Sequence, residues 1–245
     1  MRTLILGVGF DDISFEDALE KASGMVRARS AAYIVTPNPE IVVMCGEDER
    51  LLAAVNGADL VLADGAGITL AARIPGGSPI RRIPGIDFAE ALIGRLSSAG
   101  KCKLFLFGAK PGVAELAAEE LERRYSGAEV VGICDGYSAR DEEIGKKAAE
   151  TKPDVMLVCL GAPKQELWMS ENAGKIDAGV MIGLGGALDV FSGNVKRAPK
   201  AWRKAGMEWL YRLLKDPRRI KRMTRIPVFI IRVTAARLRG KKDAR

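Results

Sequence analysis

The chain has 245 residues, of which 48% are hydrophobic, 28% charged and 6% aromatic, a composition that fits a globular protein and excludes a disordered or fibrous one. Its net charge of +7 is unevenly distributed, because residues 1–195 contain 20 Lys and Arg against 28 Asp and Glu, whereas residues 196–245 contain 18 against 3. We therefore predict an acidic body over residues 1–195 and a basic appendage over residues 196–245.

The chain contains no histidine, which excludes Ser-His-Asp and Cys-His catalysis and His-ligated zinc. General acid or base chemistry must then come from a carboxylate. The four cysteines form no C-x-x-C pair and are predicted to be buried side chains of a protein in a reducing compartment: Cys45, Cys102, Cys134 and Cys159. No Asp-x-Asp motif is present, and the acidic run 141–143 is typical of the first turn of a helix, so we expect neither a metal nor another cofactor.

Seven short apolar runs, each followed by turn residues, predict buried strands at 3–8, 32–36, 59–63, 103–107, 129–134, 154–160 and 179–182. The first run is too short and wrongly flanked for a signal peptide or a membrane span. Helical patterns lie between the runs; Ser14 with Asp17 predicts one helix start, and Pro111 begins a helix that ends near Tyr125. This alternation predicts an α/β fold, with a mainly parallel Rossmann-like sheet flanked by helices.

Ligands of such sheets bind beyond the carboxyl ends of the strands, and polar or glycine-rich residues follow six of the predicted strands. The loops 108–112 and 183–187 could hold a diphosphate on backbone N–H groups, or could be tight turns that need glycine. Neither loop is a P-loop, and no G-x-G-x-x-G follows the first strand, which argues against a dehydrogenase. We expect a nucleotide to lie against Gly108, Ala109, Gly161, Gly185, Gly186 and Asp189.

Several strand-end residues have a functional and a structural interpretation. Asp64 could accept a proton from a hydroxyl or could cap the helix that follows it. Arg82 precedes a helix for which Asp87 is a natural cap, and could bind an anion or belong to a solvated loop pair.

Thr36 and Asn38 suit sugar hydroxyls or phosphate, or form a rigid turn between prolines. Gln165 is predicted to be buried or to face a substrate, whereas Lys164 and Glu166 are expected to be surface residues.

Taken together, these residues resemble the WecG/TagA/CpsF glycosyltransferases over nearly the whole chain. The resemblance is carried by Thr36-x-Asn38-x-Glu40, Asp64-Gly65-x-Gly67, Arg82-Ile-Pro-Gly-x-Asp87, Gly161-x-Pro-Lys-Gln165-Glu166, Gly185-Gly186-Ala-x-Asp189-x-x-x-Gly193, Arg197-Ala-Pro199 and Glu208-Trp-Leu-Tyr-Arg212. It is strongest to the branch of the family that builds the linkage unit of wall teichoic acid.

That resemblance implies transfer of N-acetylmannosamine from UDP-N-acetylmannosamine to the 4-hydroxyl of N-acetylglucosamine on undecaprenyl diphosphate, with inversion and without a metal. It implies that Asp64 is the base and that Thr36, Asn38, Arg82 and Gln165 line the active site. It also implies that three appendage arginines complete the pocket against phosphate: Arg212, Arg219 and Arg222. Relatives that transfer another UDP-hexose, such as N-acetylmannosaminuronic acid or glucose, share these motifs, so the donor sugar stays open.

The basic appendage mixes apolar residues with Lys and Arg, and its longest apolar run, residues 226–231, is far shorter than the roughly 20 residues that span a bilayer. Basic amphipathic helices lie in the membrane interface, which predicts a protein held peripherally at the cytoplasmic face of the plasma membrane. The aliphatic content fits lipid better than nucleic acid, so we expect no nucleic-acid partner. A nucleic-acid-binding protein with a nucleotide-sensing α/β body is the alternative from a different class. Whether the chain forms a homo-oligomer stays open.

Overall fold

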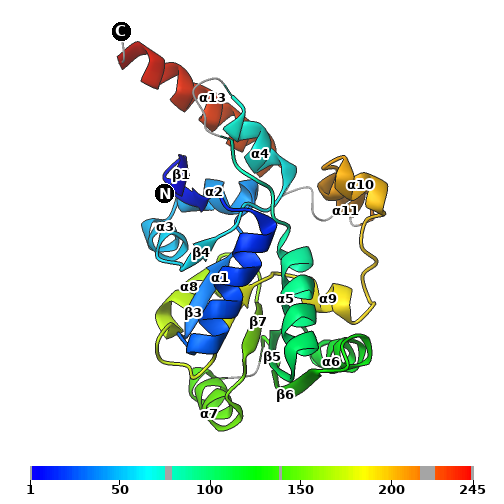
Figure 1. The fold of residues 1–245 in the computed structure, drawn as a ribbon. Helices are drawn as coiled ribbons and strands as arrows, with labels where there is room; N and C mark the ends of the chain where they lie inside the picture. Colours follow the sequence, from blue (N-terminus) through cyan, green and yellow to red (C-terminus); the bar gives the residue numbers. More distant parts are fainter. Residues whose placement is uncertain (1, 75–78, 138–139, 216–223, 244–245) are drawn as a thin grey trace.

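The computed structural model describes residues 2–74, 79–137, 140–215 and 224–243 (Figure 1). Six strands form one parallel sheet in the order β4-β3-β8-β7-β5-β6. Their bounds are β3 (Ala32–Val35), β4 (Leu60–Val61), β5 (Cys102–Gly108), β6 (Ala128–Cys134), β7 (Val155–Cys159) and β8 (Val180–Gly183). The predicted α/β fold is confirmed, and six of the seven predicted strands are present.

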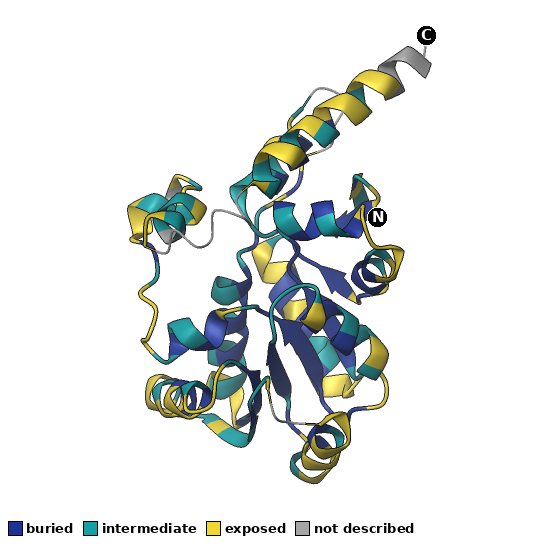
Figure 2. Cartoon of the chain, turned by 180° about the vertical axis from the view of Figure 1, so that it is seen from behind, coloured by how far each residue is buried: buried dark blue, intermediate teal, exposed yellow. Residues whose placement is uncertain are grey.

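Helices cover both faces of this sheet, so that its strands are buried between two layers (Figure 2). Successive side chains of a strand point to opposite faces, and accordingly Tyr33 and Val35 pack into one core while Ile34 packs into the other. Burial on both faces explains why the strands are continuous apolar runs.

One face carries α1 (Phe15–Ala28), α5 (Gly85–Ala99), α6 (Val113–Arg124) and α9 (Ala187–Phe191). The other carries α2 (Pro39–Cys45), α3 (Glu49–Asn56), α4 (Ala66–Ala72), α7 (Asp141–Thr151) and α8 (Lys164–Asn172). The predicted start of α1 is confirmed, because the Asp17 N–H donates to the Ser14 hydroxyl over 3.1 Å. The helix predicted to begin at Pro111 is α6, but it begins two residues later, at Val113, with Gly112 as its N-cap. The acidic run 141–143 is the first turn of α7, as expected.

The prediction of a strand over residues 3–8 is wrong, because this segment turns back on itself. It forms an antiparallel hairpin of β1 (Arg2–Ile5) and β2 (Val8–Asp11) outside the parallel sheet. Leu6 and Gly7 make the two-residue turn, with φ of 49° and 86°. Positive φ values at both positions are typical of the two-residue turn whose backbone matches the twist of the paired strands. Leucine is unusual at the first position of such a turn, so the sequence pattern does not indicate a hairpin here.

The appendage forms α10 (Lys200–Lys204), α11 (Glu208–Lys215) and α13 (Arg225–Asp243), the last of which extends away from the body (Figure 1). The first part of α13 packs against α2 and α4, where Phe229 and Val233 are buried in the core of the body. No helix in the described ranges is both long and apolar enough to cross a membrane.

Candidate active site

A cleft of about 630 Å³ lies over the carboxyl ends of β4, β3, β8 and β7, with walls that include residues of α4, α11 and α13. Parallel strands deliver their carboxyl ends to one edge of a sheet, so residues far apart in sequence meet there. Eight of the residues predicted to form the site line this cleft: Thr36, Asn38, Asp64, Arg82, Gly161, Gln165, Gly185 and Gly186.

Asp64 stands at the end of β4, where its backbone N–H donates to the Pro37 carbonyl over 3.1 Å and joins the ends of two strands. The helix that follows begins at Ala66, and its N-cap is Gly65 rather than Asp64. Gly65 has a φ of 89° and makes no side-chain capping bond. The capping interpretation of Asp64 is therefore wrong, and its carboxylate lines the cleft.

Thr36 and Asn38 are each held by one bond at the end of β3. The Thr36 hydroxyl donates to the Gly183 carbonyl over 3.0 Å and links β3 to β8. The Asn38 carboxamide oxygen accepts from the Ile41 N–H over 3.1 Å and caps α2. These bonds orient both side chains in the cleft wall, so a structural role for each accompanies any role in binding.

Gln165 joins the loops that follow β7 and β8. Its Oε1 accepts from the N–H groups of Gly161, at 3.2 Å, and Gly185, at 2.8 Å. Its Nε2 donates to Glu166 Oε1 over 2.8 Å. Gln165 is thus buried, as predicted, and it occupies two backbone N–H groups of the glycine loops.

Glu166 is buried and not a surface residue, contrary to the sequence-based expectation. Its Oε1 accepts from Gln165, whereas Oε2 has no hydrogen-bond partner among the described residues. Burial raises the pKa of the Glu166 carboxyl, and the nearby Glu40 carboxylate raises it further. Nothing in the sequence marks this residue beyond its place next to Gln165.

Arg82 connects the body to the α10–α11 hairpin above the cleft. Its Nη1 donates to the Arg203 carbonyl over 3.0 Å, and its Nη2 lies 4.0 Å from Glu208 Oε2. The turn of the hairpin lies directly on α4, because a Cβ added to Gly206 would lie 2.5 Å from the Ala66 Cβ. The hairpin therefore covers the cleft beside Asp64.

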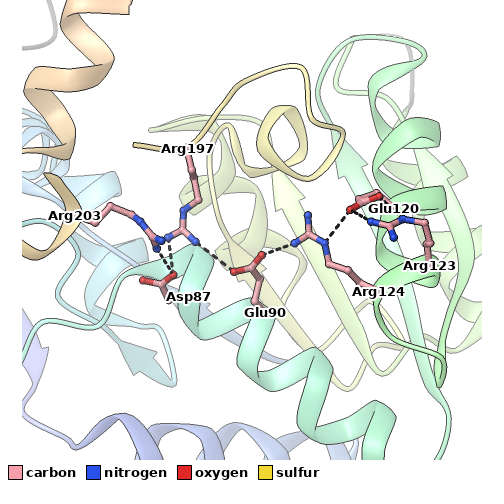
Figure 3. A network of polar contacts seen from close by, with 7 residues as sticks. All are labelled: Asp87, Glu90, Glu120, Arg123, Arg124, Arg197 and Arg203. Carbon is pink, nitrogen blue, oxygen red and sulfur yellow. Dashed lines mark hydrogen bonds and ion pairs between the residues drawn. The ribbon is translucent and has the colours of Figure 1, made fainter. Parts of the chain in front are cut away.

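A chain of ion pairs fixes the base of this hairpin to α5 (Figure 3). Asp87 is paired with Arg197 at 2.6 Å and with Arg203 at 3.3 Å, and Glu90 joins Arg197 to Arg124. The prediction that Asp87 caps α5 is wrong, since Pro84 is the N-cap. Sequence reasoning assigned no role to Arg197, which lines the cleft, because only the fold brings its carboxylate partners together.

Gly108, Ala109 and Asp189 are not among the residues that line the cleft. Gly108 has a φ of 124°, and an added Cβ there would strike the Cys159 backbone of the neighbouring strand. Asp189 lies in α9, where its carbonyl accepts from the Val195 N–H over 2.8 Å. The geometry thus gives Gly108 the role of a tight turn, one of the two interpretations left open by the sequence.

Three appendage arginines predicted to contact phosphate cannot be placed: the side chain of Arg212, and all of Arg219 and Arg222, lie outside the described residues. The four cysteines are buried and unpaired, as predicted. Burial raises the pKa of Cys45, Cys102 and Cys159 to about 12, which makes them inert thiols. In the parts of the chain that the structure describes, no three Cys, Asp or Glu side chains are grouped as metal ligands.

Comparison with known proteins adds a second line of evidence to this geometry. The model of the glycosyl transferase WecG/TagA/CpsF family matches residues 3–243. The chain belongs to this family. An N-acetylglucosaminyldiphosphoundecaprenol N-acetyl-beta-D-mannosaminyltransferase of Bacillus spizizenii strain W23 is 37% identical over 202 residues, covering 82% of this chain and 78% of the relative.

A second transferase of the same description, from Staphylococcus aureus strain MW2, is 35% identical over 240 residues, which is 97% of this chain and 94% of the relative. The similarity to this WecG/TagA/CpsF relative therefore extends through the appendage, including α10, α11 and α13.

Proposed function

We propose that this glycosyltransferase moves N-acetylmannosamine from UDP-N-acetylmannosamine to the 4-hydroxyl of N-acetylglucosamine on undecaprenyl diphosphate, inverting the anomeric centre. The observation that carries the proposal is the gathering of Asp64, Thr36, Asn38 and Arg82 in one cleft of a chain from this family. The names of the relatives describe both the sugar and the acceptor.

In the proposed reaction, Asp64 accepts the proton of the acceptor hydroxyl while the hydroxyl oxygen attacks the anomeric carbon from the face opposite UDP. The bond between that carbon and the diphosphate oxygen breaks, and its electron pair leaves with UDP. Arg82 is a cation of the cleft wall that can stabilise the departing diphosphate, and Arg212, Arg219 and Arg222 are proposed to add to it. This scheme needs no metal and no other cofactor.

The donor sugar rests on the relatives, because the motif residues do not distinguish one hexose from another. A UDP-hexose such as N-acetylmannosaminuronic acid or glucose remains the alternative within the same fold, and no observation in the cleft favours it. Nucleotide binding is proposed at Gly161, Gly185 and Gly186, which line the cleft, through contacts other than the Gly161 and Gly185 N–H groups that already donate to Gln165.

We also propose that the protein docks on the cytoplasmic face of the plasma membrane through α13. Val228, Ile231 and Leu238 are 37%, 67% and 61% exposed, and their spacing of three and seven residues places them on one side of the helix. The appendage carries a net charge of +15, and each Lys or Arg near an anionic surface contributes about 1 kcal/mol. A peripheral location would place the cleft at the surface that holds a lipid-linked acceptor.

The base is tested with Asp64→Asn, a variant that keeps the size and polarity of the side chain. We expect transfer to a soluble lipid-linked N-acetylglucosamine to fall about 10²- to 10⁴-fold, the usual contribution of a general base. UDP binding, measured by calorimetry, should change little, since the variant removes a proton acceptor and no cation.

Arg82→Gln provides the matched comparison, because it removes a cation from the same cleft. It should weaken UDP binding as well as slow transfer. Full activity of Asp64→Asn would show that Asp64 is not the base, and would contradict the proposed mechanism.

A further inference from the structure

The cleft has two chemically different ends. One end, at the strand termini, contains the polar side chains of Asp64, Thr36 and Arg82. The other end lies between α4 and α13 and is lined by the aliphatic side chains of Leu70, Ile226 and Ile230, with Arg73 beyond Leu70 at the end of α4. A ligand that fills the cleft would thus meet polar groups at the strand termini, and aliphatic side chains with one arginine between α4 and α13.

Helix α4 contributes to this apolar end with one well-defined face. Ala66 and Leu70 are four residues apart and lie on one side of the helix, Arg73 is its C-cap, and all three line the cleft. Ile68 and Ala71, on the other side, are buried in the core. Leu70 is 58% exposed although its helix is half buried, so it presents an apolar surface to the cleft.

Helix α13 forms the opposite wall, and its rotation is fixed. Phe229 and Val233, four residues apart, anchor one face in the core. Arg225 and Arg232 both pair with Glu47, at 3.7 and 3.0 Å.

Ile226 and Ile230, also four apart, consequently face the cleft and are only partly buried. The apolar wall is therefore a preformed feature of the docked helix.

We infer that this α4–α13 groove binds the first isoprene units of the prenyl chain of a lipid-linked acceptor, whose sugar lies at the polar end beside Asp64. The inference rests on the proposed function, since it takes the acceptor to be a prenyl diphosphate sugar. Such a molecule has a polar head joined to a long apolar tail, which matches a cleft lined by polar side chains at the strand termini and by aliphatic side chains of α4 and α13.

Direct binding tests the groove without relying on turnover. Farnesyl diphosphate and dimethylallyl diphosphate share one head group and differ in the length of the tail. We expect the full-length protein to bind farnesyl diphosphate more tightly, and Leu70→Gln to reduce that preference about three- to tenfold, the scale of one lost aliphatic contact. Leu70 is exposed, so this substitution leaves the core intact. Ile226→Gln, on the opposite wall, should have the same effect.

Leu116→Gln is the matched control, since Leu116 is 46% exposed on α6 and is not among the residues that line the cleft, and it should keep the wild-type preference. Two results would contradict binding of a prenyl chain in the α4–α13 groove. The wild type could bind the two diphosphates equally, or the Leu70 and Leu116 variants could lose the preference for farnesyl diphosphate to the same extent. Failure of the proposed function gives a different result: the wild type would prefer farnesyl diphosphate yet transfer no sugar to a prenyl-linked acceptor.

Discussion

Glu166 accepts a hydrogen bond from Gln165 and so keeps that side chain in one orientation. The Glu166 carboxyl group is buried, with the Glu40 carboxylate nearby. Because Gln165 accepts from Gly161 and Gly185, the pair determines the relative position of two loops that line the cleft. A buried carboxyl is more easily protonated than one in water, which links the geometry of the loops to pH.

The raised pKa of Glu166 has a definite consequence for stability. Between the ordinary carboxyl pKa and the raised value, the unfolded chain releases the proton while the folded protein retains it, so stability falls as pH rises through this window. Glu166→Gln keeps an oxygen that can accept from Gln165 but cannot ionise. We therefore expect its free energy of unfolding, measured with urea over a pH series, to fall less over the same window.

Glu171→Gln supplies the control, since Glu171 is an exposed glutamate of the same helix, paired with Arg50. It should retain the pH dependence of the wild type. If Glu166→Gln also retained it, the buried carboxyl would not be the group that titrates.

At the residue level, the site residues that follow strands of the sheet could be predicted from their order in the chain. Asp64, Thr36 and Gln165 could be predicted to meet because each follows a strand of one parallel sheet. Glu166 and Arg197 could not, because their burial and partners depend on helices that pack from elsewhere in the chain. Gly108 was predicted to contact the nucleotide, but the structure gives it a packing role against the neighbouring strand. In sequence, a glycine needed for close backbone packing cannot be told from one that binds a phosphate.

At the level of elements, the contact of the α10–α11 hairpin with α4 can be tested by adding a single methyl group. Gly206 has a φ of 72° and touches α4 next to Asp64. Gly206→Ala would place a Cβ 2.5 Å from that of Ala66 and push the hairpin away from the cleft. We expect the rate of transfer to fall about ten- to hundredfold, as for other small displacements of a reacting group.

Gly174→Ala isolates this contact, because Gly174 has a φ of 74° and an added Cβ there meets nothing within 4 Å. Both substitutions place alanine at a positive φ, which costs about 1–2 kcal/mol of folding stability. Only Gly206→Ala should lose transfer activity; equal activity of the two variants would show that the hairpin need not lie on α4.

Elements were predictable from sequence where burial makes the pattern uniform, as in the six parallel strands. The N-terminal hairpin was missed because Leu6 occupies a turn position usually taken by asparagine, aspartate or glycine. The attachment of α13 was also hidden, since the same aliphatic residues suit a lipid surface or a protein core. Only the structure separates Phe229, in the core, from Ile231, in solvent.

For the whole molecule, the sequence changes from acidic to basic after residue 195, but the hydrophobic core includes residues from both sides of that boundary. Phe229 and Val233 of the basic segment are buried with α2, so removal of residues 196–245 would open the core of the body. Membrane binding is therefore tested better by substitutions on the exposed face of α13 than by truncation.

The double variant Ile231→Glu with Leu238→Glu adds charge to the face proposed to meet lipid. We expect it to be released from vesicles that contain anionic phospholipid, in a sedimentation assay, because it loses apolar contact and gains repulsion. Leu116→Glu on α6 is the control and should sediment with the vesicles like the wild type. Sedimentation of the double variant with the vesicles would exclude this face of α13 as the membrane contact.

The strand-end cleft is proposed to transfer N-acetylmannosamine to a lipid-linked N-acetylglucosamine. Its most direct test is a mass-spectrometric assay of a panel of UDP-hexoses against a short-chain prenyl-diphosphate N-acetylglucosamine, with and without a metal chelator. We predict one added N-acetylhexosamine from UDP-N-acetylmannosamine, unchanged by the chelator, and little product from the other donors. No product from UDP-N-acetylmannosamine, with efficient transfer from a different UDP-hexose, would contradict the account.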